Sequence, residues 1–99
     1  MHYIKKMADH ILDELEGAKE YAEKFVEHKA KGNMSEATKY KEMANDELRH
    51  ANYIHEFAVA EIESLRKVYT PSVEMQEKWD KLHKEYVQEA ALVRQMLSM

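Results

Sequence analysis

With 99 residues the chain suits a single domain, residues 1–99, and its two glycines, one proline and 34% charged residues favour helices over a turn-rich fold. The formal charge of −4, with basic residues scattered among acids, argues against nucleic acid as a partner, and apolar runs of at most four residues argue against a membrane span, which needs roughly 20. The absence of cysteine excludes disulfides and thiolate chemistry, and it leaves the cytoplasm as the default location.

The first predicted helix covers residues 3–31. It ends before Gly32, because glycine suits the left-handed position that follows a helix. Acidic residues occupy the opposite side from the apolar face, so the helix is amphipathic. The apolar residues that recur at helical spacing on its predicted inner face are Ile4, Met7, Ala8, Ile11, Leu15, Ala18, Ala22, Phe25 and Val26.

The second predicted helix covers residues 34–69. Asn33 suits its N-cap, and Glu36 three residues later completes a pattern that resembles a capping box. The predicted inner face holds Ala37, Tyr40, Met43, Ala44, Ala51, Ile54, Ala58, Ile62 and Leu65.

The third predicted helix covers residues 71–97, with Thr70 as N-cap and Pro71 at the first helical position. Three amphipathic helices joined by short turns predict an all-α fold, an antiparallel helical hairpin plus a third helix. The predicted inner face of the third helix holds Met75, Trp79, Leu82, Tyr86, Ala90, Val93 and Leu97.

Four polar residues fall on these apolar faces, where an unpaired buried carboxylate would be costly: Glu47, His50, Glu61 and His83. Glu47 and His50 lie one turn apart and offer a carboxylate and an imidazole to one cation from one side. A Glu-x-x-His tetrapeptide is expected about once by chance in a chain of this composition. Its position on an apolar face is therefore the reason to consider a metal site.

A second carboxylate is predicted to come from the first helix. A hairpin that turns near residue 32 puts residues 14–18 opposite residues 50–46, and Glu14 lies on the shoulder of the core at that height. Glu16 and Glu20 point away. Tyr21, seven residues after Glu14, either donates a hydrogen bond to a ligand carboxylate or simply lies at the edge of the core.

Gly17 interrupts the first helix at the same height. A glycine inside a helix costs about 1 kcal/mol relative to alanine. Either a backbone or a metal-bound group approaches closely at this point, or the glycine reflects neutral drift.

Glu14, Tyr21 and Glu47-x-x-His50 together resemble half of a ferritin or rubrerythrin bundle, over the first two helices. Di-iron proteins of that kind take one Glu from each of two helices and a Glu-x-x-His from each of the other two. This chain has one of each, and its third helix has no second Glu-x-x-His. The resemblance therefore implies a ferritin-like four-helix bundle with a two-metal site that dimerisation completes.

Short encapsulated ferritins resemble the chain more closely than full-length ferritins do, although its last residues do not resemble an encapsulin-docking tail. This resemblance implies a homo-oligomer, at least a dimer, that binds iron in a di-iron centre and oxidises iron(II). Glu14 and His50 would be terminal ligands, Glu47 a bridge, and Tyr21 a neighbour of the ligands. The resemblance also makes the interior of a protein compartment an alternative location.

Three questions have alternative answers: the identity of the metal, the function and the role of Glu61 and His83. Manganese and zinc are alternatives to iron, and the alternative to a ferroxidase is a non-enzymatic module for helical self-assembly or protein interaction, in which Glu47 and His50 are a structural pair. Glu61 and His83 are predicted to form a structural hydrogen bond, with a separate metal site as the alternative. His10 and Glu14 are spaced as a surface pair.

Overall fold

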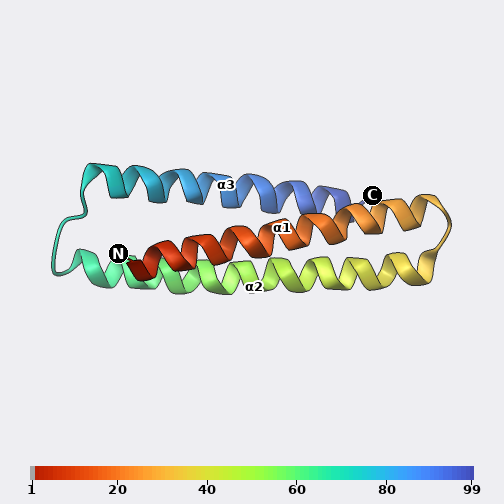
Figure 1. The fold of residues 1–99 in the computed structure, drawn as a ribbon, viewed down its shortest axis with the longest axis horizontal. Helices are drawn as coiled ribbons and strands as arrows, with labels where there is room; N and C mark the ends of the chain where they lie inside the picture. Colours follow the sequence, from red (N-terminus) through yellow and green to blue (C-terminus); the bar gives the residue numbers. More distant parts are fainter. Residues whose placement is uncertain (1) are drawn as a thin grey trace.

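The structure is a computed structural model that describes the backbone of residues 2–99 and the side chains of residues 4–99. Its helices are α1 (His2–Ala30), α2 (Met34–Arg66) and α3 (Val73–Leu97), and no strand occurs within residues 2–99. Consecutive helices are antiparallel and form a rod of 55 × 17 × 17 Å (Figure 1). The predicted all-α fold with three helices is therefore confirmed. Within residues 2–99, no helix is both long and apolar enough to cross a membrane.

The two turns agree with the sequence only in part. Gly32 has φ of +78°, the left-handed conformation predicted for it. Asn33 occupies the N-cap position of α2, but its side chain makes no capping bond, and its Nδ2 lies 3.5 Å from Nδ1 of His28. At α3 the predicted cap, Thr70, is wrong. Ser72 is the N-cap, because its hydroxyl accepts a hydrogen bond from the backbone N–H of Met75 at 3.2 Å.

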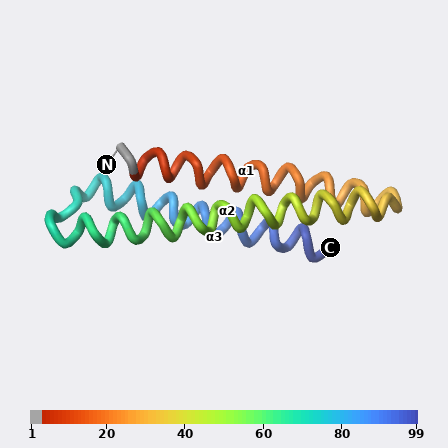
Figure 2. Tube along the Cα trace, turned by 90° about the horizontal axis from the view of Figure 1, so that it is seen from below, coloured from red at the N-terminus to blue at the C-terminus, as the bar shows by residue number. Residues whose placement is uncertain are grey.

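The core lies mainly between α1 and α2, which pack against each other much more extensively than either packs against α3. Small side chains dominate this contact and let the two helix backbones approach closely. α3 lies along the pair and packs chiefly on α1, which leaves the other side of the α1–α2 hairpin uncovered (Figures 1 and 2). The alanines that are fully excluded from solvent are Ala18, Ala22, Ala37, Ala44, Ala51 and Ala58.

The position of α3 explains two errors in the predicted inner face of α2. Met43 is predicted in the core but is 40% exposed, and α3, which packs mainly on α1, leaves much of α2 uncovered. Leu48 was not expected there and is buried, at 7% exposure.

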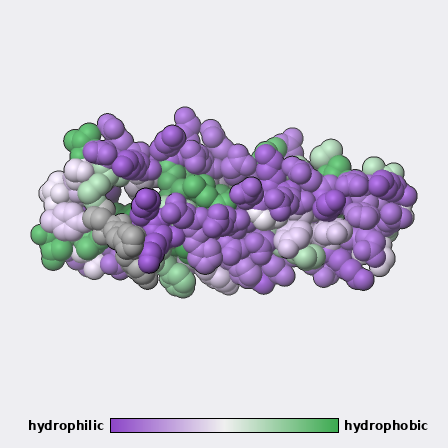
Figure 3. Space-filling model, in the orientation of Figure 1, coloured by the Kyte–Doolittle hydropathy of each residue, from purple (hydrophilic) through white to green (hydrophobic). Residues whose placement is uncertain are grey.

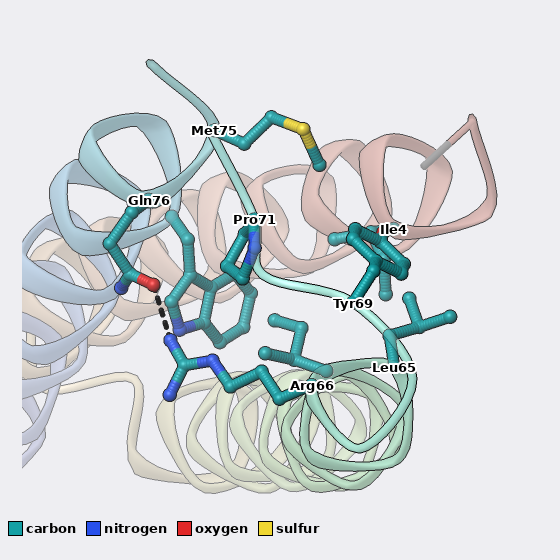
Figure 4. A pocket seen from close by; sticks show the side chains of 9 residues that line it. Ile4, Leu65, Arg66, Tyr69, Pro71, Met75 and Gln76 are labelled. Carbon is teal, nitrogen blue, oxygen red and sulfur yellow. Dashed lines mark hydrogen bonds between the residues drawn. The ribbon is translucent and has the colours of Figure 1, made fainter. Parts of the chain in front are cut away.

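The segment between α2 and α3 closes one end of the rod. Leu65, Tyr69, Pro71 and Met75 gather there with Ile4 of α1 around a cavity of about 40 Å³ (Figure 4). Arg66 donates a hydrogen bond to Oε1 of Gln76, which ties the end of α2 to the start of α3. Ligand cavities usually measure about 300–1,000 Å³, so this one is better described as imperfect packing at the end of the bundle.

The close α1–α2 contact can be tested by adding volume to it. Ala51→Leu should reduce the free energy of unfolding by about 1–3 kcal/mol, because a fully buried alanine leaves no room for extra methylenes. Ala60→Leu is the matched control, since Ala60 is an exposed position of the same helix. Urea titrations of both variants measure the free energy of unfolding. An equal decrease for the two substitutions would contradict the close packing of α1 and α2 around Ala51.

Candidate metal centre

The contact between α1 and α2 brings Glu14, Glu47 and His50 together. One ligand atom from each of the three lies within 4.8 Å of the other two. Nδ1 of His50 is 3.6 Å from Oε2 of Glu14 and 3.8 Å from Oε1 of Glu47. Two carboxylates and an imidazole are a donor set that suits iron, manganese or zinc.

These three side chains lie at the edge of the core and not inside it. Their exposed fractions are 17% for Glu14, 27% for Glu47 and 48% for His50. The expectation that Glu47 and His50 replace core residues is therefore wrong. They line the uncovered side of the hairpin, because α3 packs on its other side.

The two oxygens of Glu14 have different surroundings. Oε1 lies 3.1 Å from Nε2 of His10, the residue one turn earlier on α1. Oε2 is buried and has no hydrogen-bond partner. An acceptor left unpaired in this way is costly, and a cation held between Glu14, Glu47 and His50 would satisfy it. The residues present thus fit a metal ion.

The carboxyl groups of Glu14 and Glu47 interact strongly. The nearby carboxyl group of Glu14, together with burial, raises the pKa of Glu47 to about 7. The Glu47 carboxyl group, which keeps the proton, in turn lowers the pKa of Glu14, with smaller contributions from His10 and His50. The pair therefore holds one proton on Glu47 where an isolated glutamate would be ionised. A bound cation would displace that proton, so metal binding should release it.

Gly17 lies directly opposite the carboxylate of Glu47. A Cβ atom at this position would lie 2.8 Å from Oε2 of Glu47, which is too close. The glycine is therefore explained by the close approach of a candidate ligand, and neutral drift is not needed to account for it.

Tyr21 lies at the edge of the core, as one of the two interpretations predicted. Its ring packs against the core and lies 6.2 Å from the ring of Tyr40, which in turn stacks on His28 at 5.3 Å. Among the described hydrogen bonds, none joins its hydroxyl to Glu14 or Glu47. Tyr21 thus lies seven residues after Glu14 on α1 and makes no described hydrogen bond to the candidate ligands.

The predicted hydrogen bond between Glu61 and His83 is wrong. Nδ1 of His83 lies 2.9 Å from Nε2 of His55, and the two rings form the contact that the sequence had assigned to Glu61. The signal for His55 was present, because it lies four residues after Ala51 and three before Ala58 on the inner face of α2.

Comparison of the chain with protein-family models, curated proteins and solved structures finds no match. The ferritin-like interpretation therefore depends on Glu14, Tyr21, Glu47 and His50 in the sequence and on the grouping of Glu14, Glu47 and His50 by the hairpin.

Gly17→Ala tests whether the position of the Glu47 carboxylate matters for metal binding without destabilising the fold. The substitution should leave thermal stability unchanged or raise it by up to about 1 kcal/mol, because alanine favours helix and the flexible end of Glu47 can move aside. It should weaken the binding of manganese(II) or iron(II), because Oε2 of Glu47 is displaced. Calorimetric titration measures the affinity, with Glu16→Ala at an exposed position of α1 as the control. Unchanged affinity in Gly17→Ala would show that Glu47 is not a ligand.

The proton held on Glu47 predicts that the stability of the metal-free protein depends on pH. A carboxyl group whose pKa rises from 4.5 to about 7 on folding stabilises the folded state below pH 4.5 and loses that contribution as pH rises to 7. Glu14, with its lowered pKa, acts in the opposite direction and only as the pH falls below 4.5. With a chelator present, wild-type stability should therefore fall between about pH 5 and pH 8 more steeply than that of Glu47→Gln, which has no such proton to lose. Parallel melting curves for the two proteins across this range would contradict the shared proton.

Proposed function

We propose that this chain is an iron-binding, ferritin-like protein that oxidises iron(II) at a carboxylate-rich centre shared between two copies. The observation that carries the proposal is the convergence of Glu14, Glu47 and His50, from two helices, on one point at the edge of the hairpin. Hard carboxylate oxygens stabilise iron(III) more than iron(II), and the imidazole suits both states. The same donor set makes manganese and zinc competitors of iron.

The surroundings of the site support a shared centre. Met43 and Phe57 lie seven residues before and after His50, on the same side of α2, and they are 40% and 62% exposed. A second copy related by a two-fold axis would cover these apolar side chains and bring a second set of three ligands to the first. The six ligands would then match the pattern of two lone Glu and two Glu-x-x-His in four-helix di-iron bundles.

In the proposed reaction iron(II) is the substrate. Two iron(II) ions lose one electron each, and dioxygen takes up both electrons with two protons and leaves as hydrogen peroxide. Glu14 and Glu47 neutralise the charge that the ions gain, and Glu47 gives up its proton as they bind. His10 holds Oε1 of Glu14, so that Oε2 stays directed toward His50. The second copy would exclude bulk water from the uncovered side.

His50→Ala should slow the oxidation of iron(II) by air at least about tenfold, because loss of even a partner that only orients a metal ligand typically costs about 10–100-fold in metal affinity or activity. The measurement adds anaerobic iron(II) to the protein and follows the appearance of iron(III) after oxygen is admitted. His28→Ala is the control, since His28 contacts Tyr40 and lies well away from the three ligands. Equal rates in wild type and His50→Ala would exclude a ferroxidase centre.

Light scattering of the same samples tests the sharing of the site. The wild type is expected to be a dimer or a larger assembly across micromolar concentrations. A strictly monomeric protein that still oxidises iron(II) would keep the function and refute the shared centre. A protein that assembles but neither binds nor oxidises iron would favour the alternative, a helical self-assembly module with a structural Glu–His pair.

A further inference from the structure

A second pair of titratable side chains joins α2 to α3, and it shares no residue with the candidate metal centre. Nε2 of His55 lies 2.9 Å from Nδ1 of His83, and the ring centroids are 5.0 Å apart. This distance fits a direct hydrogen bond in which one imidazole N–H donates to the unprotonated nitrogen of the other ring.

The ring of His55 lies between two aromatic rings of α3. It stacks on Tyr86 at 4.4 Å and on Trp79 at 5.8 Å, with interplanar angles of 9° and 18°. Because residues 79 and 86 are seven apart, their positions on α3 differ by about 10.5 Å along the helix axis, which leaves room for one ring between them. Tyr86 also donates a hydrogen bond to Oδ1 of Asn52 at 3.1 Å. His55 therefore contacts three side chains of α3, those of Trp79, His83 and Tyr86.

The hydrogen bond between the imidazoles requires that at least one of them stays neutral. With no extra proton, one ring donates and the other accepts. With one extra proton the bond persists, because the imidazolium donates to the neutral ring. With two extra protons every ring nitrogen carries a hydrogen, no acceptor is left, and two positive charges face each other at hydrogen-bonding distance.

We propose that His55 and His83 form an acid-sensitive contact that holds the first half of α3 on α2 and releases it when both imidazoles are protonated. The contact persists when the pair takes up one extra proton and breaks when it takes up a second. This role is independent of the proposed metal chemistry, which uses neither of these histidines.

The packing of α3 allows a release of this kind to be local. α3 packs on α1 more extensively than on α2. Its second half is anchored by Val93 and Leu97, which are 0% and 5% exposed. Its first residue, Val73, is 75% exposed. An apolar groove between α1 and the start of α3 already separates the two helices there (Figure 3).

The charges around the pair oppose the second proton more than the first. Glu56, next to His55 on α2, favours a positive charge on that ring. Burial and a charge on His83 both lower the pKa of His55, burial more strongly. From the other helices, Lys5 of α1 and Lys78 of α3 line the groove beside Trp79, and Asp80 lies one turn before His83 on α3. Because burial and a charged His83 both oppose a proton on His55, the pair takes up its second proton less readily than its first.

The single tryptophan makes the release measurable, because Trp79 stacks on His55 itself. Lowering the pH of the full-length protein in the presence of a chelator should shift tryptophan emission to the red, with a midpoint below the usual histidine value of about 6.5. Amide exchange of residues 73–86 should increase in the same range, while residues 90–97 stay protected. Far-UV circular dichroism should show that α1 and α2 remain helical.

His83→Gln is the decisive variant. A glutamine amide can donate to His55 but cannot become charged, so the emission shift should disappear or move to much lower pH. His28→Gln, at a histidine stacked on Tyr40, and Glu47→Gln, at the candidate metal centre, should both keep the wild-type transition. A His83→Gln protein that is folded and shows the wild-type transition would overturn the proposal. So would a transition that disappears in Glu47→Gln, because it would then belong to the metal centre.

If His83→Gln does not fold, histidine proton resonances of the wild type decide the matter. Protonation of His55 should then coincide with loss of protection at the start of α3. Protonation of both rings without any change in α3 would overturn the proposal. Iron oxidation at neutral pH should be the same in wild type and in a folded His83→Gln, so failure of one proposal does not entail failure of the other.

Discussion

The close approach of α1 and α2 is the constraint on which the other features of this molecule depend. Fully buried alanines, and one glycine at the height of Glu47, let the two backbones come near enough for side chains of both helices to meet. With larger residues in the seam, Glu14 would be too far from Glu47 to share a proton with it. The candidate metal centre therefore follows from the small size of residues that themselves take no part in chemistry.

The same seam explains why the chain has two chemically different sides. α3 covers one side of the hairpin and seals it with aliphatic and aromatic side chains. The other side has the carboxyl groups of Glu14 and Glu47, the exposed imidazole of His50 and two exposed apolar side chains, Met43 and Phe57. A rod of three helices cannot cover a two-helix seam on both sides. A fourth helical element, from a second copy under our proposal, would have a place to pack.

Much of this arrangement could be predicted from the sequence. The apolar spacing identified the buried residues of α1 from Ile11 to Phe25, and the turn at Gly32 set the height at which Glu14 meets Glu47. Both depend only on helical periodicity and on the antiparallel turn, which are local properties. The helical cost of Gly17 indicated a close approach only as one of two interpretations, and the carboxylate of Glu47 opposite it decides between them.

What the sequence could not determine is the rotation and position of α3 around the hairpin. Periodicity says which face of a helix is apolar, but not which side of a partner pair it covers. For this reason Met43 was placed in the core and is exposed, and His83 was paired with Glu61 and instead contacts His55. The N-cap of α3 was predicted wrongly for the same reason. The path of the segment that connects α2 and α3 decides that Ser72, and not Thr70, caps the helix.

The position of Gly17 against Glu47 has an evolutionary consequence. A side chain at position 17 displaces the carboxylate at position 47, so Gly17 is constrained as long as that carboxylate has to keep its place. A lineage that loses the glutamate gains freedom to place alanine, the better helix former, at the glycine position. Among natural relatives, the two positions should therefore change together, and a glycine retained in the middle of this helix would mark the chains that have kept the acid opposite it.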